Sequence, residues 1–270
     1  MGWALAGRNA GPARHASDEA SEENKLEQAV AGGQQPGGSP GTAVRIRDGL
    51  VIVLALTSGA VDAVTFVRLG NVFSSVITGN LALLGLAVGE RHGALATSSG
   101  LALAAYAAGV LAGGALAGPI EGGQPTWPRR TTMTMAAELV VLAGFSAGWL
   151  AAGGHPSGGV RMTLLALTAA AMGMQSAAVR LLGQMSTTYL TSTLIGIFQS
   201  LAVRRVPQDW QRSTGVLLAF VAGAALGVAG ALASPALVPV AVMLPLAVVV
   251  LGAARSAALR QPRAPAGHSS

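Results

Sequence analysis

The sequence predicts an all-α fold, a polytopic transmembrane helix bundle of about eight helical segments. Hydrophobic residues make up 51% of the 270 positions and charged residues only 10%, whereas about a quarter of residues are charged in soluble proteins. The apolar residues also gather in runs of about 18 to 25, the length that a helix needs to cross about 30 Å of hydrocarbon. We therefore expect a multi-pass protein of the cell inner (cytoplasmic) membrane, with the lipid bilayer as its environment.

The apolar runs begin after residue 45 and are separated by short polar or Gly/Pro-rich stretches. We expect segments at about 48–68, 72–89, 94–118, 131–152, 161–182, 185–203, 213–233 and 236–255. Two of them begin with a hydroxyl-rich half, FSSVITGN and MSTTYLTST, which a lipid-facing helix would not tolerate. These two segments are either broken or re-entrant, which leaves six to seven full crossings, or their hydroxyls bond to the carbonyls of their own and neighbouring helices.

Hydrophilic tails are expected before and after the membrane domain in the sequence. Residues 1–44 contain five acidic and three basic residues, are rich in Gly, Ala, Pro and Ser, and have no apolar periodicity. This composition predicts a disordered N-terminal tail, and residues 256–270 are expected to form a disordered C-terminal tail. The transmembrane domain then covers residues 45–255.

The arginines between the apolar runs predict an orientation. With eight crossings and a cytoplasmic N-terminus, ten arginines fall inside and four outside, the four being Arg68, Arg129, Arg130 and Arg180. Since cytoplasmic loops carry the excess of Lys and Arg, both termini are predicted to be cytoplasmic, with Gly122 outside and Gly154 inside. The arginines stand singly or in pairs between apolar runs, so no nucleic-acid partner is expected.

The membrane domain contains a weak internal repeat. Residues 59–81, GAVDAVTFVRLGNVFSSVITGNL, align at an offset of 113 with residues 172–194, MGMQSAAVRLLGQMSTTYLTSTL. The same offset superposes the apolar segments that follow, which predicts two similar four-helix halves at about 45–155 and 156–255. Because four is an even number of crossings, we expect both halves to run in the same direction across the membrane.

An acid lies inside the first apolar segment. Asp62 is flanked by Ala and Val on both sides, and a carboxylate at that depth costs about 2.5 to 3.5 kcal/mol even on a lenient scale. It aligns with Gln175 in the second half. The functional interpretation is a proton- or cation-coupling carboxylate or a substrate contact. The structural interpretation is an ion pair with Arg68 or Arg180.

Further polar residues are candidates for the same site. Thr78 and Asn80 belong to the ITGN run, and Thr191 occupies the corresponding place in the second half. Small polar residues at matching places in two halves indicate a midplane binding site in transporters built from repeats. We therefore expect a substrate or ion site lined by Asp62, Thr78, Asn80, Gln175, Arg180 and Thr191.

Other chemistry has little support in the sequence. Glu138 lies near the start of the fourth segment, where we expect it to reach the interface or to pair with Arg129 or Arg130. The four histidines have no second ligand at metal spacing, and no phosphate loop or nucleophile elbow is present. We expect no enzyme activity, no metal and no cofactor.

Two runs of the sequence resemble a known family. SGAVDAVTFVRLGNVFSSVITGNLALLGLA and MGMQSAAVRLLGQMSTTYLTSTLIGIF are similar to the YoaK-like family of bacterial multi-pass membrane proteins, a domain-of-unknown-function family. The resemblance covers about residues 45–255. It rests on the intramembrane acid, on the FxxxxTGN pattern from Phe73 to Asn80 and on the MQxAAxR-like run from Met174 to Arg180. Ser192 and Thr193 stand where a TG-like pair would be expected. The resemblance implies an inner-membrane protein and assigns no substrate.

The hypothesis that follows is a permease or secondary-transporter-like protein for a small solute or coupling ion, with Asp62 as its intramembrane carboxylate. The alternative is a non-transporting membrane scaffold or interaction protein, in which the polar stretch is an interaction seam.

Overall fold

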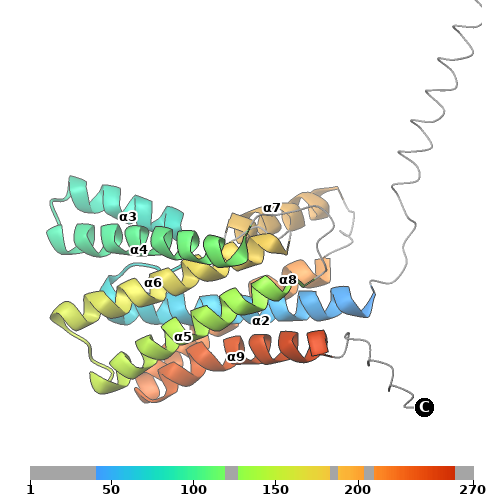
Figure 1. The fold of residues 1–270 in the computed structure, drawn as a ribbon. Helices are drawn as coiled ribbons and strands as arrows, with labels where there is room; N and C mark the ends of the chain where they lie inside the picture. The colour runs from blue at the N-terminus through green and yellow to red at the C-terminus, as the bar shows by residue number, and fades with distance from the viewer. Residues whose placement is uncertain (1–40, 119–126, 183–187, 204–209, 259–270) are drawn as a thin grey trace, which may run out of the picture. The chain divides into compact units, whose positions relative to one another are not determined.

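The computed structural model describes residues 41–118, 127–182, 188–203 and 210–258, and all regular secondary structure within these ranges is helical (Figure 1). The prediction of an all-α bundle is therefore confirmed. The helices are α2 (Thr42–Thr65), continued by a π-helical segment η1 (Phe66–Gly70), α3 (Ile77–Gly89), α4 (Gly93–Ala117), α5 (Arg129–Ala151), α6 (Gly158–Leu181), α7 (Thr188–Ala202), α8 (Trp210–Ala233) and α9 (Leu237–Ala258).

These helices match the eight predicted segments, but six of them are long and apolar enough to cross a membrane: α2 with η1, α4, α5, α6, α8 and α9. Helices α3 and α7 have 13 and 15 residues, or about 20 Å at 1.5 Å per residue, against about 30 Å of hydrocarbon. The hydroxyl-rich run FSSVITGN does not belong to a helix that starts at residue 72, because α3 begins only at Ile77. The other hydroxyl-rich run, MSTTYLTST, overlaps residues 183–187, which lie outside the described residues.

The expected tails fall mostly outside the described residues as well. Where the structure describes them, they are helical, because α2 begins at Thr42 and α9 continues to Ala258. The helices of the membrane domain therefore extend about three residues further at each end than the sequence predicts.

The helices run in alternating directions along the bundle. Helices α2, α5 and α8 run one way and α4, α6 and α9 the other (Figure 1). The indole nitrogen of Trp149, near the end of α5, donates to the carbonyl of Pro235, just before α9, at 2.8 Å, so α5 and α9 are antiparallel. We call the end where α2 begins and α9 finishes the first end, and the end where α5 meets α6 and α8 meets α9 the second end.

These directions overturn one expectation from the sequence. Helices α2 and α6 begin the two predicted halves, and they run in opposite directions (Figure 1). The expectation of halves that run the same way is wrong, because α3 and α7 are too short to cross. Each half therefore has three long helices, which is an odd number.

Helices α4 and α6 approach each other at glycines. A Cβ atom at Gly109 of α4 would collide with the backbone carbonyl of Ala170 of α6, and a Cβ at Gly173 of α6 with the carbonyl of Tyr106 of α4. Only residues without a side chain allow such an approach. In a membrane, where lipid tails are as apolar as leucine, this close packing is a main source of helix association.

Helices α2 and α8 approach each other in the same manner. A Cβ atom at Gly223 of α8 would collide with the carbonyl of Leu56 of α2, and a Cβ at Gly59 of α2 with the carbonyl of Phe220 of α8. The bundle thus contains two tightly packed parallel pairs, α4–α6 and α2–α8.

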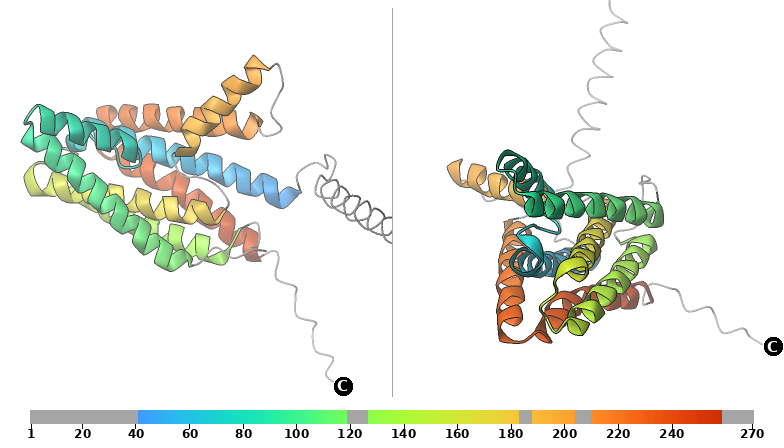
Figure 2. Two further views of the ribbon diagram at one scale, coloured as in Figure 1. Left: turned by 90° about the horizontal axis from the view of Figure 1, so that it is seen from above. Right: turned by 90° about the vertical axis from the view of Figure 1, so that its left-hand side faces the viewer.

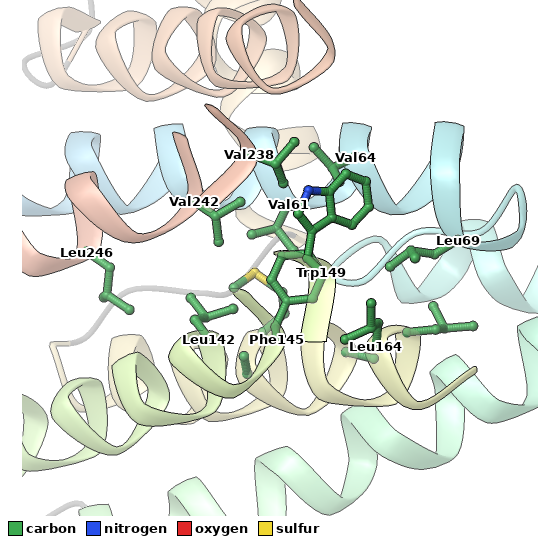
Figure 3. Packing of buried hydrophobic residues seen from close by; sticks show 14 of the residues in the cluster. Val61, Val64, Leu69, Leu142, Phe145, Trp149, Leu164, Val238, Val242 and Leu246 are labelled. Carbon is green, nitrogen blue, oxygen red and sulfur yellow. The ribbon is translucent and has the colours of Figure 1, made fainter. Parts of the chain in front are cut away.

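The hydrophobic core lies where α2, α5, α6 and α9 meet. Helix α5 packs against both α6 and α9 (Figure 2). Trp149 and Phe145 are the largest fully buried side chains, and their rings are tilted by 36° to each other with centroids 6.0 Å apart. Figure 3 shows them among Val61, Leu142, Leu164, Val238 and Val242.

Replacing Gly109 by Ala should destabilise the bundle, because the added methyl group would press against the α6 backbone. Overpacking of this kind costs roughly 1 to 3 kcal/mol. The matched control is Gly114→Ala on the same helix, where a Cβ would meet nothing within 4 Å. It should be neutral or slightly stabilising, because Ala favours helix over Gly by about 1 kcal/mol. Thermal unfolding of the purified variants measures both, and equal midpoints would contradict the close approach.

Candidate functional site

The chain leaves helical form directly after η1. Gly70 has φ of 146° and Asn71 has φ of 57°, conformations that Gly adopts freely and Asn tolerates. The Asn71 amide donates to the carbonyl of Phe66 at 3.1 Å. Residues 71–76 then form a non-helical segment, which we call the break, before α3 starts at Ile77.

Asp62 binds the backbone of this break. Its Oδ1 accepts hydrogen bonds from the amides of Ser74 at 2.8 Å and Ser75 at 2.7 Å, and its Oδ2 accepts one from the Ser75 hydroxyl at 2.5 Å. The Asp62 side chain is 3% exposed. Since lipid offers no hydrogen bonds, backbone amides outside a helix need an internal partner. Asp62 supplies that partner.

Neither arginine that the sequence suggests pairs with Asp62. Among the described residues, the ion pairs within 4.0 Å join Asp48 to Arg47 and Arg212, near the first end. Arg68 donates instead to the carbonyl of Ala231 at the end of α8, at 2.9 Å. The expected ion pair with Arg68 or Arg180 is therefore wrong, and backbone and hydroxyl donors bind Asp62 instead.

Asn80 holds the other side of the break. Its Oδ1 accepts from the Phe73 amide at 2.9 Å, and its Nδ2 donates to the Phe73 carbonyl at 2.6 Å. Both polar groups of one peptide position are thus satisfied by a single fully buried side chain. The hydroxyls of Thr65 and Ser74, 2.8 Å apart, add a further bond between α2 and the break.

Gln175 links α6 to α2 close to Asp62. Its Oε1 accepts from the Ser58 hydroxyl at 3.1 Å, and its Nε2 donates to the carbonyl of Leu54 at 3.3 Å. Ser58 lies one helical turn before Asp62 on α2. Asp62, Asn80 and Gln175 are all buried. Asp62 and Asn80 bind the break, and Gln175 binds α2 one to two turns before Asp62.

The other three predicted site residues are exposed. Thr78 lies in the first turn of α3, Arg180 in the last turn of α6 and Thr191 in α7. Thr78 is two residues from Asn80 and so projects from a different side of α3. The structure thus brings together three of the six predicted residues and leaves three at the bundle surface.

Glu138 is the residue whose place the sequence did not reveal. It lies on α5, is fully buried, and neither of its carboxylate oxygens has a hydrogen-bond partner. Arg129 and Arg130 are exposed, so the expectation that Glu138 reaches the interface or pairs with them is wrong. The signal that could have found it is spacing, because Met135, Leu142 and Phe145 place position 138 on the apolar face of α5.

The described residues contain no group of three or more His, Asp or Glu side chains that could hold a metal ion. What the arrangement does chemically is to satisfy a broken backbone inside a helix bundle with one carboxylate and one amide side chain.

Comparison with known proteins gives one family and one relative. The family model described as "Protein of unknown function (DUF1275)" matches residues 50–253. The UPF0700 transmembrane protein YoaK of Bacillus subtilis (strain 168) is 32% identical over 165 residues, which cover 60% of this chain and 71% of that protein. No solved structure matches this chain significantly.

The contacts of Asp62 predict a graded response to substitution. Asp62→Leu removes the acceptor of three hydrogen bonds and leaves buried donors unsatisfied, each at a cost of about 1 to 3 kcal/mol. Asp62→Asn keeps one carbonyl oxygen for the amides of Ser74 and Ser75 and should lose less. Thermal unfolding should therefore rank the wild type above Asp62→Asn and Asp62→Asn above Asp62→Leu. An Asp62→Leu variant as stable as the wild type would show that the break does not depend on this carboxylate.

Proposed function

The chain belongs to the DUF1275 family, and from its structure we propose that it is a secondary-transporter-like permease for a small solute, built from two halves of opposite orientation. The observation that carries this proposal is the short helix at the same place in each half, α3 after α2 and α7 after α6. Many transporters consist of inverted repeats, and interrupted helices at corresponding positions are the best pointer to their binding site.

The glycine contacts support the duplication. Gly109 and Gly223 lie 114 positions apart, and so do Ala170 and Leu56, the residues that they contact. Two further contact pairs have counterparts at the same spacing on α2 and α8. Gly173 with Tyr106 matches Gly59 with Phe220, and Gly113 with Met174 matches Gly227 with Ala60. The helix pair α4–α6 therefore corresponds, residue by residue, to the pair α8–α2.

The directions of these helices favour an inverted repeat. Helices α2 and α8 run one way, and their counterparts α6 and α4 run the other (Figure 1). Two halves related in this way have a pseudo-two-fold axis in the membrane plane. Helices α5 and α9 correspond in the same relation, and they are antiparallel neighbours.

Within this proposal Asp62 and Asn80 are positioning residues. Both carboxylate oxygens of Asp62 already accept hydrogen bonds from the break, so its role is to fix the non-helical backbone. A substrate would then meet backbone groups and hydroxyls that Asp62, Asn80 and Gln175 hold in place.

The arginines support cytoplasmic termini. Of the described arginines, seven lie toward the first end, namely Arg45, Arg47, Arg129, Arg130, Arg180, Arg212 and Arg255, and three toward the second end, namely Arg68, Arg91 and Arg161. This bias favours a cytoplasmic first end. The bias is also stronger than the one that the eight-crossing arrangement gives for the same ten arginines, because that arrangement places Arg129, Arg130 and Arg180 outside.

Reporter insertions at Gly122, between α4 and α5, and at Gly154, between α5 and α6, test this orientation. Six crossings place the first reporter in the cytoplasm and the second outside, the reverse of the eight-crossing expectation. A green fluorescent reporter, which is active in the cytoplasm, and alkaline phosphatase, which is active outside it, together distinguish the two arrangements. Gly122 outside with Gly154 inside would refute the six-crossing topology.

A screen of small solutes against the purified protein tests transport. A solute that binds the native state raises its unfolding temperature, and the same solute should accumulate in proteoliposomes that contain the protein but not in empty vesicles. Asn80→Ala should abolish uptake, whereas Gly114→Ala should leave it intact. A protein that no solute stabilises, yet that captures a specific membrane partner, would support the scaffold interpretation in place of transport.

A further inference from the structure

Two buried acids lie within the long helices, and their surroundings differ completely. Asp62 receives three hydrogen bonds, so its negative charge is compensated by donors. Glu138 is 0% exposed, and both of its oxygens lack a donor. An ionised carboxylate in a low-dielectric interior is strongly disfavoured without such partners.

Among the residues that the structure describes, no cation compensates Glu138 either. Helix α5 packs against α4, α6 and α9 and meets α2 in the hydrophobic core. The other charged or titratable side chains on these five helices are Arg45, Arg47, Asp48, Asp62, Tyr106, Arg129, Arg130, Arg161, Arg180 and Arg255. Tyr106 donates to the Ser176 hydroxyl at 2.7 Å, and in the described part of the chain no arginine lies within 4.0 Å of Glu138.

We propose that Glu138 is a proton-binding site whose carboxyl group is protonated in this conformation and loses its proton only when the packing around it opens to water. Release breaks the carboxyl O–H bond, passes the proton to a water molecule and leaves a carboxylate. A lone carboxyl group suits a proton better than a metal ion, which takes several oxygen ligands.

A row of hydroxyls leads from Glu138 toward the first end of the bundle. Thr131 and Thr134 lie seven and four residues before Glu138, on the same face of α5, and both are buried. The Thr131 hydroxyl has no hydrogen-bond partner. Glu138 is about 13 Å from the start of α5 at 1.5 Å per residue, so two threonines span most of the path that a proton would take.

The role of this proton in transport rests on the proposed function, in which it would be the coupling ion. The site itself does not depend on that function, because burial and the missing partners alone argue for it.

Infrared spectroscopy of the full-length protein in lipid nanodiscs tests protonation directly. The wild type at neutral pH should show the carbonyl stretch of a protonated carboxylic acid. The band should vanish in Glu138→Gln, which keeps the shape of the side chain, and remain in the control Asp62→Asn. Absence of the band from the wild type, or its persistence in Glu138→Gln, would overturn the proposal.

Stability as a function of pH gives a second measurement that needs no spectroscopic assignment. If the native state holds a proton that the unfolded chain releases, stability must fall as pH rises. Between pH 7 and pH 9.5 the unfolding temperature of the wild type should drop more than that of Glu138→Gln. Equal drops would contradict a protonated Glu138.

Uptake by proteoliposomes separates this inference from the proposed function. If a solute is transported, a pH gradient should drive it in the wild type but not in Glu138→Gln. Uptake driven by sodium with no infrared band would overturn the proton site and leave transport standing. A Glu138-dependent band without uptake of any solute would leave the proton site standing and count against transport.

Discussion

The constraint on which this fold depends is that a backbone inside a bilayer must find all its hydrogen bonds within the protein. Between η1 and α3 the chain gives up helical hydrogen bonds for six residues, and side chains replace them. Asp62 accepts hydrogen bonds from the backbone amides of Ser74 and Ser75, and Asn80 bonds to both the backbone amide and the carbonyl of Phe73. Because the break is satisfied, α3 can start inside the bundle as a helix of 13 residues, too short to cross the membrane.

The long helices associate chiefly by close backbone contact. Lipid gives little hydrophobic drive for helices to pair, so the glycines of α4–α6 and α2–α8 provide the attraction by allowing backbones to touch. A second contribution comes from the core around Trp149, whose indole also binds the Pro235 carbonyl. One region of the bundle is thus held by small residues and the other by large ones.

The sequence predicted the helical class, eight segments and three of the buried polar residues, because apolar runs and polar interruptions are local features. It could not predict the partners of Asp62, which are amides of a non-helical segment rather than a charged side chain. The burial of Glu138 was not predicted, because a position near the start of an apolar segment does not show how deeply the side chain is buried. The polar stretch aligns at an offset of 113, whereas the glycine contacts repeat at an offset of 114.

The glycine contacts also determine which parts of the bundle can move as units. Each tight pair takes one helix from each predicted half, α4 with α6 and α2 with α8. Neither predicted half can therefore rotate as a body without separating backbones that are in contact. Motion that keeps these contacts must occur between the α4–α6 pair and the α2–α8 pair. Each moving unit would then combine helices that are far apart in the sequence.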